Sequence, residues 1–246
     1  FELRLTIGKK TFTVSSPVSF ANSVPGASVV SLAGTQIVNT ASIPLSKLKW
    51  AAGDLVSGTN VIASTSIGFL PAAPVSVGVG TSVNFTGNLV LNPYQPSTHL
   101  PPGLYVGSNI IWEDDNGNGV LDAATEASGT FLTRINILPV STLDIETDPI
   151  DLGDVVQGQS SALVSVTVRN TGNVDLNTFV WTFSNLFQGA DTIDGVSLLK
   201  SSLFPASLSP GNTANVDVWL DAIPADQALG YYESAAGNLS NLAASG

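Results

Sequence analysis

Apolar and polar residues alternate over short stretches along the whole chain. The clearest case is Leu-Val-Ser-Val-Thr-Val at 163–168, where Val164, Val166 and Val168 share one face of an extended strand. Gly, Pro and Asn separate about seven such stretches in each half, which is typical of a β-sandwich. No long segment has apolar residues at helical spacing. The pattern therefore predicts an all-β chain of short strands.

The strand pattern occurs twice. Residues 39–50 read NTASIPLSKLKW and residues 170–181 read NTGNVDLNTFVW, a spacing of 170 − 39 = 131 residues. Further matches follow in the same order, such as Gly103-Leu104-Tyr105 with Gly230-Tyr231-Tyr232, and the gaps fall in predicted loops. We therefore predict an N-terminal segment (1–9), a first domain (10–138) and a second domain (139–246).

The two copies place a tryptophan at the same point of their third predicted strand. Trp50 and Trp181 are the last residues of the matched segments. A buried Trp on this strand is a hallmark of immunoglobulin-like sandwiches, so we expect both to anchor a core. The alternative is a surface ring that stacks on sugars. The predicted fold class is two tandem immunoglobulin-like β-sandwiches.

The second copy resembles a known group of modules. Residues 151–176 read DLGDVVQGQSSALVSVTVRNTGNVDL and resemble the opening of immunoglobulin-like modules of prokaryotic surface proteins, of the ASPM/hydin and CARDB types. LSPGNTANVDVWL at 208–220 and LGYYE at 229–233 are similar to later strands of those modules. The resemblance implies the fold and an extracellular or cell-surface context. It implies no chemistry, because such folds have many roles.

The composition of the chain excludes several classes of partner and chemistry. The net charge of −11 and the lack of a basic stripe argue against nucleic acid. The absence of Cys excludes disulfides and thiol chemistry, and no apolar run is long enough for a membrane span. We expect that a signal peptide is cleaved before Phe1; the alternative is a fragment of a longer protein.

The sequence contains no catalytic motif. The single histidine, His99, lies in a Pro-rich stretch, and no nucleophile elbow or phosphate-binding loop is present. We predict that the protein is not an enzyme. Asn84 and Asn238 lie in glycosylation sequons, and both glycosylation and surface glycans as partners stay open.

Residues 114–122, DDNGNGVLD, are typical of a calcium-binding loop. The spacing departs from an EF-hand at its end, where Thr125 stands in place of the bidentate Glu and Glu126 comes one residue later. The alternative is a metal-free Asn-Gly hairpin turn. The predicted ligands of one Ca²⁺ are Asp114, Asn116, Asn118, the carbonyl of Val120 and Asp122, with Glu126 as a further ligand.

A second group of acidic residues lies where the two copies join. It consists of Asp144, Glu146, Asp148, Asp151 and Asp154. The spacing fits either an interdomain cation site or a solvated strand edge protected against aggregation.

The copies differ at their ends. Copy one closes with Phe131–Ile137 (FLTRINI), whereas residues 237–246 are poor in strand formers, so we expect copy two to lack its final strand. Phe1–Ile7 (FELRLTI) matches Phe131–Ile137 at a spacing of 131 − 1 = 130 residues. Phe1, Leu3, Leu5 and Ile7 fall on one face of this strand. The N-terminal segment is therefore predicted to close a second domain, in the same chain or in another copy.

These predictions favour a structural subunit of an extracellular filament or pilus-like fibre. Donation of the N-terminal strand to another copy gives a head-to-tail homopolymer, because such a contact does not close. Calcium would stiffen the subunit. The alternatives are a two-module fragment of a surface adhesin or S-layer protein, and a carbohydrate-binding module attached to a secreted enzyme.

Overall fold

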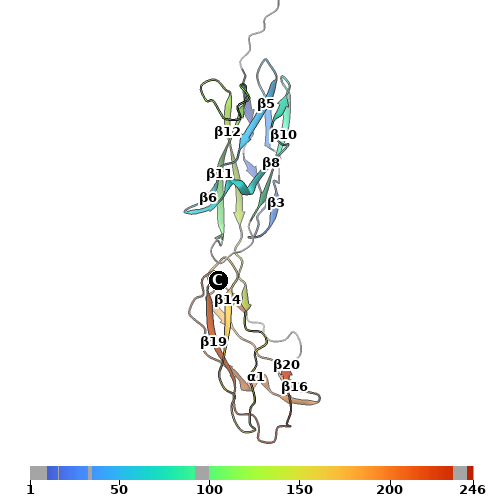
Figure 1. The fold of residues 1–246 in the computed structure, drawn as a ribbon, viewed down its shortest axis with the longest axis vertical. Helices are drawn as coiled ribbons and strands as arrows, with labels where there is room; N and C mark the ends of the chain where they lie inside the picture. The colour runs from blue at the N-terminus through green and yellow to red at the C-terminus, as the bar shows by residue number, and fades with distance from the viewer. Residues whose placement is uncertain (1–9, 16, 33–34, 92–99, 235–242, 246) are drawn as a thin grey trace, which may run out of the picture. The chain divides into compact units, whose positions relative to one another are not determined.

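The computed structural model describes residues 10–15, 17–32, 35–91, 100–234 and 243–245. The described residues up to Leu138 form one compact unit, unit one, and those from Pro139 onward form another, unit two. Strands make up nearly all of the regular structure, which confirms the predicted all-β, immunoglobulin-like sandwich class (Figure 1). No helix in the described ranges is long and apolar enough to cross a membrane.

Unit one contains two sheets. In the first, β4 (Thr35–Asn39) and β10 (Ser82–Val90) lie between β1 (Phe12–Val14) and β3 (Ser28–Val30), and β8 (Ile67–Leu70) also pairs with β10. The second has the order β2 (Val18–Ser19), β12 (Ser128–Ile137), β11 (Gly103–Glu113), β5 (Leu45–Ala51) and β9 (Val75–Val77). A hairpin of β6 (Leu55–Ser57) and β7 (Asn60–Ile62) pairs with β11 and precedes the short helix η1 (Ser64–Ser66).

Unit two has one larger sheet and two small ones. The larger sheet has the order β13 (Leu143–Ile145), β14 (Val164–Asn170), β19 (Thr213–Leu220) and β18 (Leu199–Ser201). The small sheets are β15 (Thr178–Val180) with β21 (Ala243–Ser245), and β17 (Asp191–Ile193) with β16 (Leu186–Gln188) and β20 (Glu233–Ser234). A single helical turn, α1 (Gly195–Leu198), follows β17, and the Asp194 side chain caps it by accepting a hydrogen bond from Ser197 N.

The two units repeat the same strand register. Phe12 pairs with Asn39 in unit one, and Leu143 pairs with Asn170 in unit two. Both partners are displaced by the 131 residues that separate the sequence repeats. The pairing of β4 with β10 recurs in the same way between β14 and β19. The internal repeat is therefore a repeat of backbone pairing as well as of sequence.

A buried asparagine fixes the same turn in each unit. Asn39 Nδ2 donates to the carbonyls of Ile43 and Val77, and its Oδ1 accepts from Ala41 N. Asn170 makes the equivalent three hydrogen bonds, to Val174, Leu208 and Gly172. Both asparagines are almost fully buried, and their hydrogen bonds satisfy buried or part-buried backbone groups of the turn.

We expect Asn39→Ala and Asn170→Ala each to destabilise its own unit by about 2–4 kcal/mol, because each substitution removes three hydrogen bonds to backbone groups of the turn. Chemical denaturation followed separately for the two units would measure this. Asn84→Ala and Asn215→Ala are matched controls, since both residues are exposed on equivalent strands and should change stability little. Equal effects at the buried and exposed sites would contradict the prediction.

The tryptophans of the repeat are half-buried rather than fully buried, which corrects the expectation from sequence. Trp50 lies on β5 and packs edge-on against Phe85, with ring centroids 4.7 Å apart. Trp181 follows β15 and stacks on Phe183 with a centroid distance of 5.4 Å. Both rings pack at the margin of their cores, where one side stays in contact with solvent.

Candidate functional site

The second sheet of unit one depends on its last strand. β12 pairs along its whole length with β11, from Gly103↔Ile137 to Trp112↔Ser128. On its other side it pairs in parallel with β2 at Val18 and Ser19. β12 thus lies between β11 and β2 and covers the core beneath them.

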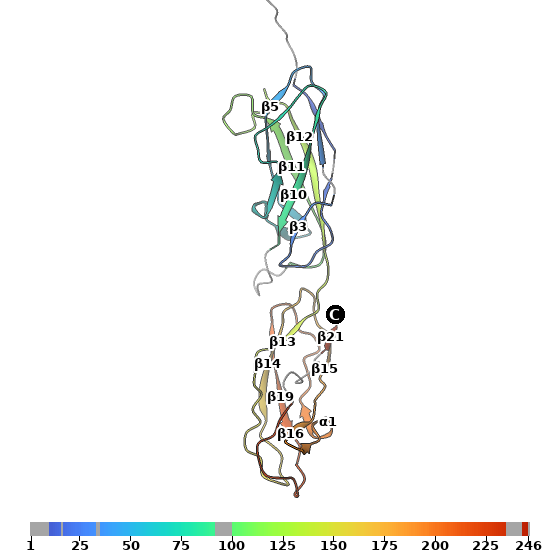
Figure 2. The same cartoon turned by 90° about the vertical axis from the view of Figure 1, so that its right-hand side faces the viewer.

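The counterpart of β11 in unit two consists of β20 and β21. β11 pairs Val106 with Val56, and β20 pairs Glu233 with Phe187. At the other end, β11 pairs Leu48 with Glu113, and β21 pairs Phe179 with Ala244 (Figure 2). The strand β20 covers only Glu233–Ser234, and residues 235–242 lie outside the described residues.

A tyrosine confirms where this counterpart starts. Tyr105 Oη donates to the carbonyl of Pro101, four residues earlier, at 2.9 Å. Tyr232 Oη donates in the same way to the carbonyl of Ala228 at 3.0 Å. Tyr232 therefore takes the place of Tyr105 in unit two.

Unit two has no counterpart of β12 among its described residues. There β21 pairs with β15 alone, and β20 pairs with β16 alone. The segment that corresponds to β2 contains Ile150 and Leu152 and forms no strand. As far as the structure is described, the sheet thus has an open edge at the place that β12 fills in unit one.

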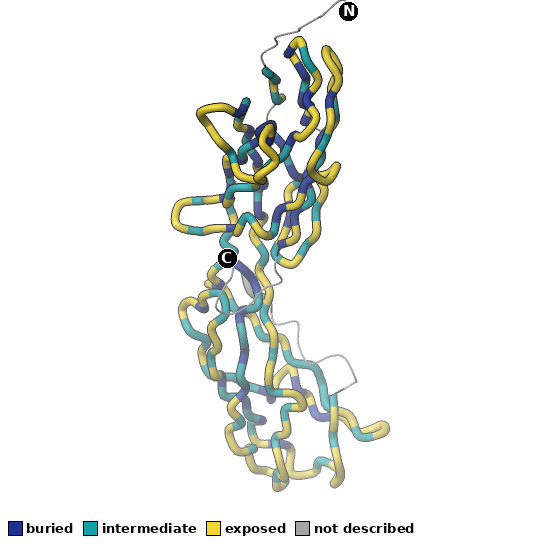
Figure 3. The backbone as a smooth tube through the Cα atoms, turned by 45° about the horizontal axis from the view of Figure 1, so that its top comes forward, coloured by how far each residue is buried: buried dark blue, intermediate teal, exposed yellow. Residues whose placement is uncertain are grey.

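The burial of equivalent side chains also differs between the two units. Residues on the complete sheet of unit two, such as Val166, Val168 and Val216, are as buried as any in unit one. On the open sheet, side chains that are buried in unit one are only half-buried in unit two (Figure 3). The pairs are Val18 and Ile150, Phe20 and Leu152, Leu48 and Phe179, Leu55 and Leu186, and Tyr105 and Tyr232. The core of unit two is therefore incompletely covered on one side.

β12 shows which residues a covering strand needs. Its inward residues are Phe131, Thr133, Ile135 and Ile137, each no more than 2% exposed. The predicted match aligns Phe1, Leu3, Leu5 and Ile7 with these positions. Phe1–Ile7 lies outside the described residues, so this assignment stays a prediction.

The start of the described chain is fastened at one end of β11. Lys10 Nζ donates to Glu113 Oε1 at 2.9 Å and also forms an ion pair with Asp115. Glu113 is fully buried and accepts further hydrogen bonds from Ser46 N and Lys47 N. The hydrogen bonds from Lys10 to both carboxylates raise the pKa of its ammonium against the opposing effect of burial.

The predicted calcium loop joins β11 to β12 at this same end of unit one (Figures 1 and 2). Asp114 and Glu126 are buried, whereas Asn116, Asn118, Val120 and Asp122 are exposed. Asn116 Oδ1 accepts from Asn118 N, and Asn118 Oδ1 accepts from Val120 N. Within the described residues, no three His, Cys, Asp or Glu side chains are grouped so that they could hold a metal ion.

Lysines that are distant in sequence partner this loop. Lys49 Nζ lies 2.7 Å from Asp114 Oδ2, and its hydrogen bond holds the pKa of the Asp114 carboxyl below its usual value. Lys47 Nζ donates to the carbonyl of Asp115 at 3.3 Å. The loop motif alone gives no sign of these partners, because they lie on β5.

The other predicted acidic group is not a compact cluster. Asp144, Asp148, Asp151 and Asp154 are exposed, and Asp151 accepts a hydrogen bond from Gly153 N. Glu146 is also exposed, and it pairs with Arg169 on the neighbouring strand. These contacts favour the solvated strand edge over a cation site.

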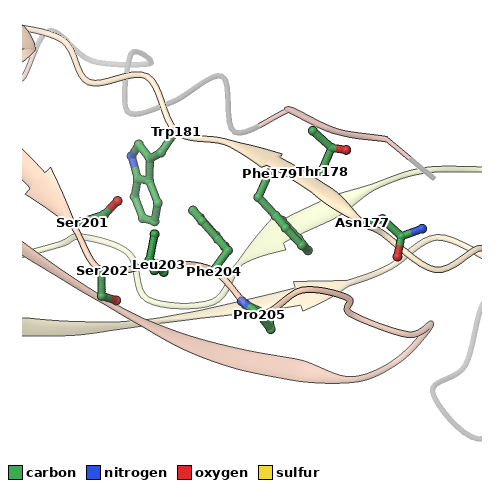
Figure 4. Close-up of a pocket in the computed structure, with 9 residues that line it drawn as sticks. All are labelled: Asn177, Thr178, Phe179, Trp181, Ser201, Ser202, Leu203, Phe204 and Pro205. Atoms are coloured by element: carbon green, nitrogen blue, oxygen red, sulfur yellow. The ribbon is translucent and has the colours of Figure 1, made fainter.

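A pocket of about 490 Å³ lies at the aromatic margin of unit two (Figure 4). Phe179, Trp181 and Phe204 contribute rings to its wall, and Phe179 and Phe204 are stacked with centroids 4.9 Å apart. Leu203 is 94% exposed at its rim. Because Trp181 packs on Phe183 and lies 5.8 Å from the Phe204 ring, its role as a core anchor accounts for this arrangement.

The chain is similar to several solved structures of low sequence identity. One is a chaperone–tip adhesion subunit pre-assembly complex of the Csu pili of Acinetobacter baumannii, at 12% identity and TM-score 0.44, over 90% of this chain and 97% of that one. Another is a CARDB domain from Pyrococcus furiosus in complex with di-metal ions, at 14% identity and TM-score 0.27, over 56% and 95%.

A third similar structure is a family 123 glycoside hydrolase from Clostridium perfringens, at 14% identity and TM-score 0.36. It is matched over 53% of this chain, and this chain spans 27% of that protein. No family model and no curated protein matches the chain. Because these TM-scores are low, we assign the fold class from the sheets of this structure and not from the similar structures.

Proposed function

We propose that the protein is a structural subunit of an extracellular filament, in which unit two of each copy is completed by a β-strand from another copy. The observation that supports this most directly is the open edge of unit two together with its half-buried core. An edge with unpaired backbone groups above apolar side chains is a template for an added strand.

The donor in this proposal is the arm, residues 1–9, with Phe1–Ile7 as the strand. Its alternation places apolar residues where β12 places its buried ones. Ile135 lies directly opposite Tyr105 in unit one. By the repeat, Leu5 would lie opposite Tyr232 in unit two, and its side chain would cover the half-buried ring.

The position of Lys10, the first residue after the arm, favours donation of the arm to another copy. Lys10 is fastened near Glu113, whereas Ile137, which precedes the link to unit two, pairs with Gly103 at the opposite end of β11. β11 has 11 residues and spans about 34 Å at this strand rise. Nine residues extend to about 31 Å at most. The arm is therefore too short to run the length of β11 and reach unit two of its own chain.

Cysteine cross-linking tests strand donation, because the chain has no native Cys. Directly opposed residues on paired strands have the Cα separation that a disulfide needs. The double variant Leu5→Cys/Tyr232→Cys should therefore give a covalent ladder on non-reducing electrophoresis after mild oxidation. Thr6→Cys/Tyr232→Cys is the matched control and should stay monomeric, since residue 6 points to the other face.

Mixing separates the two modes of closure. Leu5→Cys alone mixed with Tyr232→Cys alone should give a covalent dimer if the strand comes from another copy. A double variant that oxidises only within a monomer would show closure within one chain and would refute the polymer. The absence of any cross-link, with the protein monodisperse by native mass spectrometry, would favour a two-module fragment of a larger surface protein.

A further inference from the structure

The carboxylates of three consecutive acidic residues at the end of β11 pair with two lysines. Glu113 and Asp115 both hold Lys10, and Asp114 holds Lys49. These contacts join the base of the arm to the loop between β11 and β12. A ligand that orders this loop would therefore also restrict Lys10, the residue from which the arm extends.

Two buried carboxylate oxygens of this loop have no hydrogen-bond partner: Asp114 Oδ1 and Glu126 Oε1. Asp114 is 1% exposed and Glu126 is 7% exposed, so water does not satisfy these atoms readily. The other oxygen of each carboxylate accepts a loop N–H, from Gly119 and from Asp122 respectively. The two carboxylates thus face the loop from its two ends.

The loop backbone is shaped around these groups. Gly117 and Gly119 have φ angles of 74° and 80°, a left-handed conformation that favours glycine. A Cβ at Gly119 would lie 3.3 Å from Lys49 Nζ, so a side chain there would also crowd the ammonium group. The turn lets the chain fold back over the Asp114 carboxylate.

The available ligand atoms are all oxygens, which suits Ca²⁺. Zinc prefers nitrogen and sulfur ligands, and Mg²⁺ requires a strict octahedron. Among the described residues, only these two buried carboxylates have an oxygen without a hydrogen-bond partner, so amide oxygens, backbone carbonyls and water must supply the remaining ligands. Few charged ligands and a neighbouring ammonium imply weak binding, with a Kd on the order of 10⁻⁴–10⁻³ M as in other extracellular calcium sites.

We propose that the loop binds one Ca²⁺ through Asp114 Oδ1 and Glu126 Oε1, and that the ion fixes the base of the donor arm through the adjoining Glu113–Lys10 and Asp115–Lys10 ion pairs. The second part rests on the proposed function. An arm held at its base loses less freedom when its strand enters another copy, so the ion should accelerate fibre growth.

Calorimetric titration of the full chain with CaCl₂ tests the site. Saturable binding is expected, with MgCl₂ binding at least about tenfold more weakly. Glu126→Gln should abolish Ca²⁺ binding while it keeps the hydrogen bond to Asp122 N. Lys49→Gln should tighten binding several-fold, because it removes the ammonium group beside Asp114. Asp144→Asn, an exposed carboxylate of unit two, is the control and should change nothing.

Fibre growth in CaCl₂ and in chelator tests the coupling to the arm. Growth should be faster with Ca²⁺, and Lys10→Gln should remove this difference without loss of Ca²⁺ binding. If no binding occurs at millimolar Ca²⁺, the site is wrong, even where fibres still form and strand donation stands. Ca²⁺ binding that leaves growth unchanged overturns the coupling, and Ca²⁺ binding by a protein that never polymerises refutes the proposed function.

Discussion

Deletion of Phe1–Ile7 is expected to abolish fibres and to leave the second unit of every subunit open. The four apolar residues that fall on one face of the predicted strand are Phe1, Leu3, Leu5 and Ile7. Their burial would contribute on the order of 6–12 kcal/mol before the entropy of ordering is subtracted. Electron microscopy should show no filaments, and calorimetry should show a lower melting temperature for unit two with unit one unchanged.

Two further samples sharpen this test. A synthetic Phe1–Ile7 peptide added in excess to the deletion variant should restore the melting temperature of unit two and cap it as a monomer. The matched control keeps the arm but replaces Glu2, Arg4 and Thr6 with Ser, which preserves its apolar face and should still give fibres. Native filaments from the deletion variant would contradict strand donation.

Tyr105→Ala should destabilise unit one by about 3–5 kcal/mol, as for other buried aromatic residues. Tyr105 has no exposed surface, and it lies opposite Ile135 beneath the complete sheet. Tyr232 is half-buried, so Tyr232→Ala should cost less than half as much in the arm-deleted chain. In the assembled fibre its cost should rise, because the added strand would then cover the ring.

The control for this comparison is a pair that is equally buried in both units. Leu45 and Leu176 are both fully buried at equivalent positions, so Leu45→Ala and Leu176→Ala should cost similar amounts of stability. Chemical denaturation of each variant, with the two units followed separately, gives all four values. An equal loss for Tyr105→Ala and Tyr232→Ala without the arm would show that the sheet of unit two is already closed.

The loop shows where motif reasoning fell short. The ligand spacing predicted Asp114 and Glu126, and both prove to be buried carboxylates. The motif also gave weight to Asn116, Asn118 and Asp122, whose exposure depends on how the loop folds. Lys10 was not predicted at all, because it is 103 residues from Glu113 along the chain. Only the pairing of strands brings such residues together.

The sequence by itself determined the class of fold and its duplication. Apolar residues at every second position predict strands. The repeat also preserves buried positions such as Asn39 and Asn170, and with them the hydrogen bonds that these side chains make. The sequence also showed that the alternation of apolar and polar residues in Phe1–Ile7 matches that of Phe131–Ile137 in β12.

Tertiary structure alone decided which positions are covered. Tyr105 and Tyr232 occupy the same place in the repeat, yet one is buried and the other half-buried. Likewise, Lys10 meets Glu113 only because β11 ends beside the base of the arm. Burial and ion pairing arise from strands that are far apart in sequence, so local pattern does not encode them.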